Sequence, residues 1–284
     1  MVAYGRTRIP GKVDPLALGV TYQSVVESLS PVAYWPMQET SGSTMAALVG
    51  SNGTYAGSPT LGAAGPTLSL PNAAQFNGTS QSASVALDVS AYSAITVAAW
   101  MYLSVGLNAR IIFEHTTNYN VNDGAFIATT NWSAGLFEAA QRGSGGAWSR
   151  RVTQPTDGVW THLAARFDRG TDATTICLNG VESSVSSGGS ALTGNFLSST
   201  LYLMSRAGSS LYAAGRLAGF AVFPSYITND QATLLATAIC PFPRQSAPSP
   251  VSADVHAWSM EDDLGGATLR FTALYDSNLA DPLA

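Results

Sequence analysis

Pairs of acidic side chains at a suitable spacing along the sequence could support catalysis. Hydrolysis of a glycosidic bond requires two carboxyl groups roughly 5–10 Å apart, which on a β-strand means acidic residues at alternate positions. No predicted strand carries a series of glutamate, aspartate and glutamate at such positions. The acidic cluster Glu261-Asp262-Asp263 falls in a predicted turn, where exposure to solvent is the simpler interpretation.

The histidines offer little further chemistry. His162 alternates with Trp160 and Ala164 in a predicted strand, which favours a structural histidine over a general base. His115 and His256 stand alone in the sequence. The chain also lacks a Gly-x-Ser-x-Gly elbow, a phosphate-binding loop and a His-Glu-x-x-His zinc motif. We therefore expect no catalytic residues and no enzymatic activity.

Aromatic and amide side chains in predicted loops suggest a ligand-binding rim instead. The face of a sugar stacks on aromatic rings while amides bond its hydroxyl groups. The candidate carbohydrate-binding residues are Tyr119, Asn122, Asp123, Asn131, Trp132 and Trp148. Tryptophans of a β-sandwich commonly belong to its core or to an interface, so this second interpretation stays open.

The composition argues against several classes of partner. The 284-residue chain has a net charge of −5, 11% charged residues and no basic run, so we expect no nucleic-acid partner. No stretch approaches the roughly 18 apolar residues of a membrane-spanning helix, and the N-terminus has no sustained apolar region, so we expect neither a membrane partner nor a standard export signal. Cys177 and Cys240 fit neither a disulfide framework nor a zinc cluster, and Cys177 is predicted to be a buried free thiol.

The elements that must position these groups are short β-strands. Residues 160–185 alternate with a period of two and contain Asn179-Gly180, which predicts a three-stranded meander with a type I′ turn. Residues 95–103 predict a central strand, with one face in the core and the other partly covered by loops. Further strands are predicted at 110–115, 124–130, 135–140 and 147–152. This pattern predicts an all-β antiparallel sandwich.

One short helix is predicted near the end of the sandwich. Thr228 and Gln231 form the pattern of a capping box, and Pro241 ends the helix. The predicted buried stripe consists of Leu234, Leu235, Ala238 and Ile239.

Two extensions flank the predicted sandwich, which we place at residues 29–240. Residues 1–28 form an irregular segment, either a terminus without fixed structure or an arm that orders against another subunit. The residues suited to such an assembly arm are Tyr4, Arg6, Arg8 and Lys12. Residues 241–284 form a proline-rich linker and a two-stranded extension, which we expect to lean on the sandwich or on a neighbouring subunit.

An ordered series of sequence blocks resembles one family. The blocks are residues 33–37 with 39–42, 51–55, 75–79, 95–100, 160–163, 178–181 and 215–223. Together they resemble the laminin G-like, or concanavalin A-like, jelly-roll proteins over about residues 30–239. The resemblance implies an antiparallel jelly-roll sandwich.

Many laminin G-like domains bind calcium at a rim, through an aspartate of an early turn and backbone carbonyls. Here the equivalent stretch is Ala46–Gly50, and Leu217-Ala218-Gly219 also lacks acidic residues, so we expect no metal site and no cofactor. A calcium site stays the alternative. The oxygen-rich stretch containing Asn118, Asn120, Asn122 and Asp123 is more simply a polar turn.

Two of the blocks also resemble virion proteins of tailed bacteriophages. Residues 30–35 and 215–218 are similar to minor tail or capsid-decorating components of this kind. The resemblance implies a structural protein on the virion surface, assembled in the host cytoplasm, with other virion proteins as partners, a homo-oligomeric state and adhesion to host-surface glycans. A carbohydrate-binding, lectin-like module without a virion role is the alternative.

Overall fold

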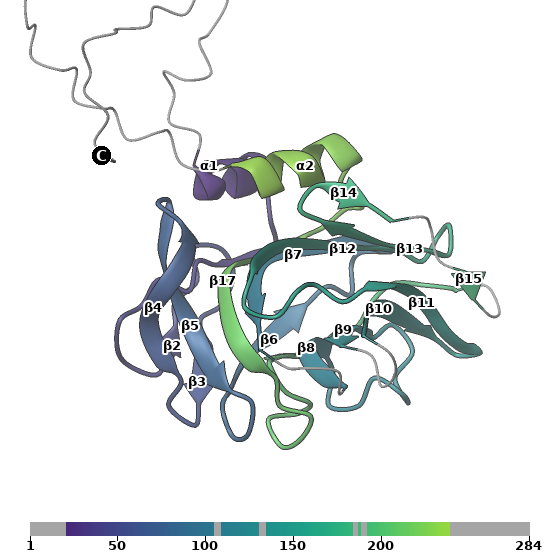
Figure 1. Cartoon of the computed structure of the whole chain (residues 1–284). Coiled ribbons are helices and arrows are strands. Elements are labelled where there is room, and N and C mark those ends of the chain that lie inside the picture. Colours follow the sequence, from purple (N-terminus) through teal and green to yellow (C-terminus); the bar gives the residue numbers. More distant parts are fainter. Residues whose placement is uncertain (1–20, 105–108, 131–134, 184–186, 189–191, 239–284) are drawn as a thin grey trace, which may run out of the picture. The chain divides into compact units, whose positions relative to one another are not determined.

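The computed structural model describes residues 21–104, 109–130, 135–183, 187–188 and 192–238, and these residues form two antiparallel sheets and two short helices (Figure 1). The first sheet has the strand order β14-β13-β12-β7-β17-β5-β4, and β1 pairs with β17. Its strands are β1 (Ala33–Trp35), β4 (Thr60–Thr67), β5 (Leu70–Asn77), β7 (Ala94–Leu103), β12 (Trp160–Asp168), β13 (Ala173–Leu178), β14 (Val181–Glu182) and β17 (Ala214–Phe223).

The second sheet has the order β15-β11-β10-β9-β8-β16-β6-β3-β2. Its strands are β2 (Thr44–Met45), β3 (Gly53–Ala56), β6 (Ser82–Asp88), β8 (Arg110–His115), β9 (Phe126–Thr130), β10 (Leu136–Gly143), β11 (Gly146–Thr153), β15 (Ser187–Gly188) and β16 (Ser198–Leu203). The helices are α1 (Tyr22–Ser28) and α2 (Asn229–Thr237). The predicted all-β sandwich is confirmed. None of the helices in these ranges is long and apolar enough to cross a membrane.

The inner core lies between the two sheets and follows from the alternation in the sequence. Ile95, Val97 and Met101 of β7 point into it, as do Leu163 and Phe167 of β12. Because side chains of a strand alternate between its faces, the intervening residues point to the outer face of the first sheet.

An outer core covers that second face. Ala98 and Trp100 of β7 and Ala164 of β12 pack there with residues of both helices. The prediction that loops partly cover this face of the central strand is incomplete. Leu29 and Ile227, which lie outside the helices, do pack in the outer core, but α1 and α2 cover the face as well (Figure 1).

The meander of residues 160–182 has the predicted form. Strands β12, β13 and β14 pair in sequence, and both Asn179 and Gly180 adopt positive φ angles of 50° and 81°, as a type I′ turn requires. The side chain of Asn179 also accepts a hydrogen bond from the backbone N–H of His162 at 2.8 Å. Cys177 is a buried free thiol, as predicted.

Helix α2 begins as predicted. Of its predicted buried stripe, Leu235 and Ala238 are buried, Leu234 is not, and Ile239 lies outside the described residues. The Thr228 hydroxyl accepts from the Gln231 N–H, and the Gln231 side chain accepts from the Thr228 N–H, which completes the capping box. Ala232, Leu235 and Ala236 are buried, whereas Leu234 is 47% exposed. Leu234 lies outside the stripe because the packed positions are spaced three and four residues apart.

Helix α1 contradicts two predictions. The chain is helical rather than irregular over Tyr22–Ser28, and the fold has a second helix besides α2. Thr21 caps the helix. Its hydroxyl accepts from the Ser24 N–H, and the Ser24 hydroxyl accepts from the Thr21 N–H, so serine takes the place that glutamate or glutamine usually has in a capping box. Tyr22, Val25 and Val26 have helical spacing and are buried in the outer core. The structured part of the chain thus includes residues assigned to the arm.

Candidate functional site

Four large side chains form a cross-strand row on the outer face of the first sheet. Trp160 of β12 lies opposite Tyr102 of β7, Tyr102 opposite Arg216 of β17, and Arg216 opposite Gln75 of β5. Tyr102 is two residues from Trp100, so the row shares the face that the helices cover. All four side chains of the row are half-buried.

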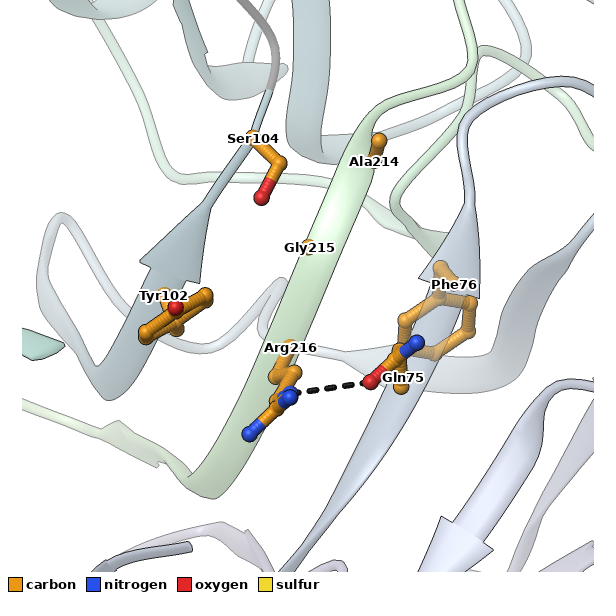
Figure 2. A pocket seen from close by; sticks show the side chains of 7 residues that line it. All are labelled: Gln75, Phe76, Tyr102, Ser104, Ala214, Gly215 and Arg216. Atoms are coloured by element: carbon orange, nitrogen blue, oxygen red, sulfur yellow. Dashed lines mark hydrogen bonds between the residues drawn. The ribbon is translucent and has the colours of Figure 1, made fainter. Parts of the chain in front are cut away.

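The side chains of the row contact one another. The rings of Tyr102 and Trp160 have centroids 5.6 Å apart, and the Arg216 guanidinium carbon lies 4.9 Å from the centroid of the Tyr102 ring. Arg216 Nε donates to Gln75 Oε1 at 2.9 Å (Figure 2). Its Nη1 donates to the carbonyl of Ala64 at 3.2 Å. The guanidinium is therefore held in one place by an aromatic face and two neutral acceptors.

A pocket of about 330 Å³ opens beside the row (Figure 2). It is lined by Gln75, Phe76, Tyr102, Ser104, Ala214, Gly215 and Arg216. Gly215 has a φ of +146°, and a Cβ there would come within 2.3 Å of the Tyr102 carbonyl oxygen. Only glycine lets β17 pass so close to β7 at this point of the pocket lining.

Two of the aromatic residues predicted to form a rim, Tyr119 and Trp148, lie on opposite faces of the second sheet. Tyr119 is 6% exposed and packs with Ala140 and Ala147 on the outer face of the second sheet. Trp148 follows Ala147 in β11 and points to the opposite face, half-buried. The Tyr119 ring therefore belongs to the protein interior and offers no face to a sugar.

The remaining rim residues have other surroundings. Asp123 accepts from Arg169 Nη2 at 2.6 Å, and Asn122 is half-buried in the preceding turn. Asn131 and Trp132 lie outside the described residues, as do Tyr4, Arg6, Arg8 and Lys12 of the proposed assembly arm.

The two described histidines are both buried. His162 is fully enclosed, its Nε2 lies 3.3 Å from the Tyr22 hydroxyl, and burial lowers its pKa to about 3. His115 stacks on Phe126 with ring centroids 4.7 Å apart, and burial also lowers its pKa. Both rings are neutral at pH 7 and inaccessible, which supports the structural interpretation of His162.

Within the described ranges, no three His, Cys, Asp or Glu side chains are grouped so that they could hold a metal ion. In the oxygen-rich turn, Asn118 Oδ1 accepts from the backbone N–H of Asn120 at 3.0 Å. The neighbouring carboxylate of Asp123 pairs with Arg169.

The cross-strand row was missed because its residues lie in strands rather than loops. A usable signal exists in the sequence, since the outward positions of three central strands carry large side chains, Tyr102, Trp160 and Arg216, where small ones would suffice. These large side chains indicate a site only when the order of the strands is known, because that order makes them neighbours.

Comparisons with known proteins agree with this fold. Residues 76–233, over half of the chain, match the family model of the concanavalin A-like lectin/glucanases superfamily. Domain 4 of AbnA, an extracellular arabinanase from Geobacillus stearothermophilus solved in complex with arabinotriose, is similar with a TM-score of 0.55 and 17% identity, covering 72% of this chain and 98% of that domain. No curated protein matches the sequence significantly.

Botulinum neurotoxin binding domains are also similar in structure. The serotype D binding domain has a TM-score of 0.56 and 12% identity, with 73% of this chain covered. The serotype D ligand binding domain in complex with N-acetylneuraminic acid has a TM-score of 0.56 and 13% identity, with 75% covered. This chain spans about half the length of those two domains, 51% and 52%.

Proposed function

The chain belongs to the concanavalin A-like lectin/glucanases superfamily, and from that membership we propose that it is a non-catalytic module that binds saccharides through the cross-strand row. The observation that carries the proposal is the row itself. The Tyr102 ring, the Arg216 guanidinium and the Gln75 amide line a pocket of about 330 Å³, and the Trp160 ring lies beside Tyr102. Such a combination stacks on the apolar face of a sugar and bonds its hydroxyl groups.

The pocket also favours binding over hydrolysis. Its lining contains no carboxylate among the described residues, whereas hydrolysis of a glycosidic bond commonly requires two. Two proteins of similar fold were solved with arabinotriose and with N-acetylneuraminic acid, and this supports a sugar as the ligand. We expect the purified chain to release no reducing sugar from the polysaccharides that it binds.

Truncating either aromatic ring of the row should weaken saccharide binding at least ten-fold. Tyr102→Ala or Trp160→Ala removes a stacking surface, and loss of a central aromatic contact commonly costs about 1.4 kcal/mol or more, which corresponds to this factor. A glycan array would identify a ligand, and calorimetric titration would then compare the variants.

The matched control is Trp148→Ala, which truncates a half-buried tryptophan of the other sheet. It should bind like the parent chain. Unchanged binding in both row variants, or weaker binding in the Trp148 variant alone, would move the site away from the row.

We propose in addition that this module is displayed on a bacteriophage virion. The support is the resemblance of residues 30–35 and 215–218 to minor tail and capsid-decorating proteins. Attachment to other virion proteins is then assigned to residues 1–20, with Tyr4, Arg6, Arg8 and Lys12, and to the segment after residue 238. The proposal includes homo-oligomeric display and adhesion to glycans of the host surface.

Deleting residues 1–20 should abolish incorporation into virions while the sandwich stays folded. The deletion must stop there, since removing residues 21–28 would also remove α1 from the outer core. Gel analysis of purified particles measures incorporation, and circular dichroism of the isolated variant measures folding. Incorporation at the parental level would refute the assignment of the arm.

A further inference from the structure

Arg216 is a half-buried cation without a carboxylate partner in the described part of the chain. Its guanidinium bonds the side-chain oxygen of Gln75 and the carbonyl of Ala64, which are both neutral. Arg166 and Arg169, by contrast, pair with Glu182 and Asp123. A partly desolvated positive charge is stabilised by a nearby negative charge, and the described part of the chain supplies no carboxylate to Arg216.

The guanidinium is also oriented for a ligand. The guanidinium carbon lies 4.9 Å from the centroid of the Tyr102 ring, and Gln75 Oε1 accepts from Nε (Figure 2). Among the described residues, Nη2 has no hydrogen-bond partner. The guanidinium is planar and its N–H groups point in fixed directions. The N–H groups that make no hydrogen bond within the chain, those of Nη2 above all, can therefore bind a small oxyanion. No lining residue of the pocket carries a negative charge that would repel such a group.

We infer that the ligand is an acidic saccharide, whose singly charged group, a carboxylate or a sulfate ester, is bound by Arg216 while a sugar ring lies against Tyr102 and Trp160. This inference rests on the proposed saccharide-binding function and adds the charge of the ligand to it. One cation lines the pocket, which matches a single negative charge. Because the whole chain has a net charge of −5, its overall charge repels anions. A preference for an anionic ligand would therefore come from the pocket itself.

The test is calorimetric titration of the full chain with matched pairs of oligosaccharides. Trigalacturonic acid is compared with its neutral methyl ester, sialyllactose with lactose, and a sulfated trisaccharide with its unsulfated form. We expect at least one acidic member to bind ten-fold more tightly than its neutral partner at low salt. The preference should shrink in 0.5 M NaCl because salt screens the charge.

Two substitutions of Arg216 locate the preference. Arg216→Gln should remove the preference, because it weakens binding of the acidic member much more than binding of the neutral member. Arg216→Lys should retain part of the preference, because lysine keeps the charge but lacks the planar, two-pronged donor geometry of arginine. Circular dichroism verifies folding of both variants. Tyr102→Ala should weaken binding of acidic and neutral members alike.

The outcomes separate the two claims. Equal binding of acidic and neutral members, or a preference that persists in Arg216→Gln, overturns the inference and leaves saccharide binding standing. Absence of binding to every saccharide overturns both. A preference confined to the sulfated pair or to the carboxylated pairs supports the inference and identifies the anionic group.

Discussion

Replacing Tyr22 by alanine is expected to lower the free energy of unfolding by about 3–5 kcal/mol, in the range of large core truncations. The Tyr22 ring is fully buried, with its centroid 5.7 Å from that of His162. Its hydroxyl donates to the Gly219 carbonyl at 3.0 Å. The truncation leaves a cavity in the outer core and removes the partner of that carbonyl. Urea denaturation followed by tryptophan fluorescence measures the change.

Tyr22→Phe is the matched control because it keeps the ring and removes only the hydroxyl. It should cost about 1–2 kcal/mol, because the hydroxyl bonds both the Gly219 carbonyl and His162 Nε2. A seven-residue helix is marginal alone, so α1 depends on this packing. If Tyr22→Ala changed the free energy of unfolding by less than Tyr22→Phe is expected to, α1 would not be part of the cooperative fold.

Acidification below pH 6.5 should lower stability by up to about 1.4 kcal/mol for each pH unit through His162 alone. Burial lowers the pKa of His162 from 6.5 to about 3 in the folded chain. Between these values the unfolded chain binds a proton that the folded chain does not bind. The contribution of His162 is therefore fully present above pH 6.5 and is lost as the pH falls toward 3. Urea denaturation at several pH values measures the slope.

Other groups titrate in the same range, so the comparison must isolate His162. Burial also lowers the pKa of His115, which adds loss in the same direction, whereas burial raises the pKa of Glu114, which acts in the opposite direction. His162→Gln removes one titrating group and leaves these two in place. The stability of the parent should fall more steeply than that of the variant between pH 6.5 and 5. Parallel curves would show that His162 does not titrate on unfolding.

The parts of the fold that were predictable are those with local causes. Alternation along β12 and the Asn179-Gly180 turn define the meander without reference to distant residues. The Thr228 and Gln231 capping box likewise defines the start of α2. Helix α1 was not predicted because it packs against a bulge in β17 at Gly219, which lies 197 residues beyond Tyr22 in the sequence. There a Cβ would come within 2.6 Å of the Tyr22 ring.

The candidate site was not predictable for a related reason. Its four residues come from four strands, and they become neighbours only through the order β12-β7-β17-β5. That order is set by the closure of the whole sandwich, so spacing along the sequence carries no trace of it. Tyr119 has the residue type and loop position expected of a sugar-binding residue, but it is buried in the fold. Arg216 was visible only as part of a closing strand.

The position of β17 has a consequence for how this chain folds during its synthesis. β17 lies between β5 and β7 and also pairs with β1, although it is the last strand of the described chain to leave the ribosome. Until residue 223 emerges, β5 and β7 have exposed edges with unpaired backbone groups, which other chains can add to. Fragments that end before residue 214 should therefore aggregate, and refolding should be slow because its decisive pairings join distant segments.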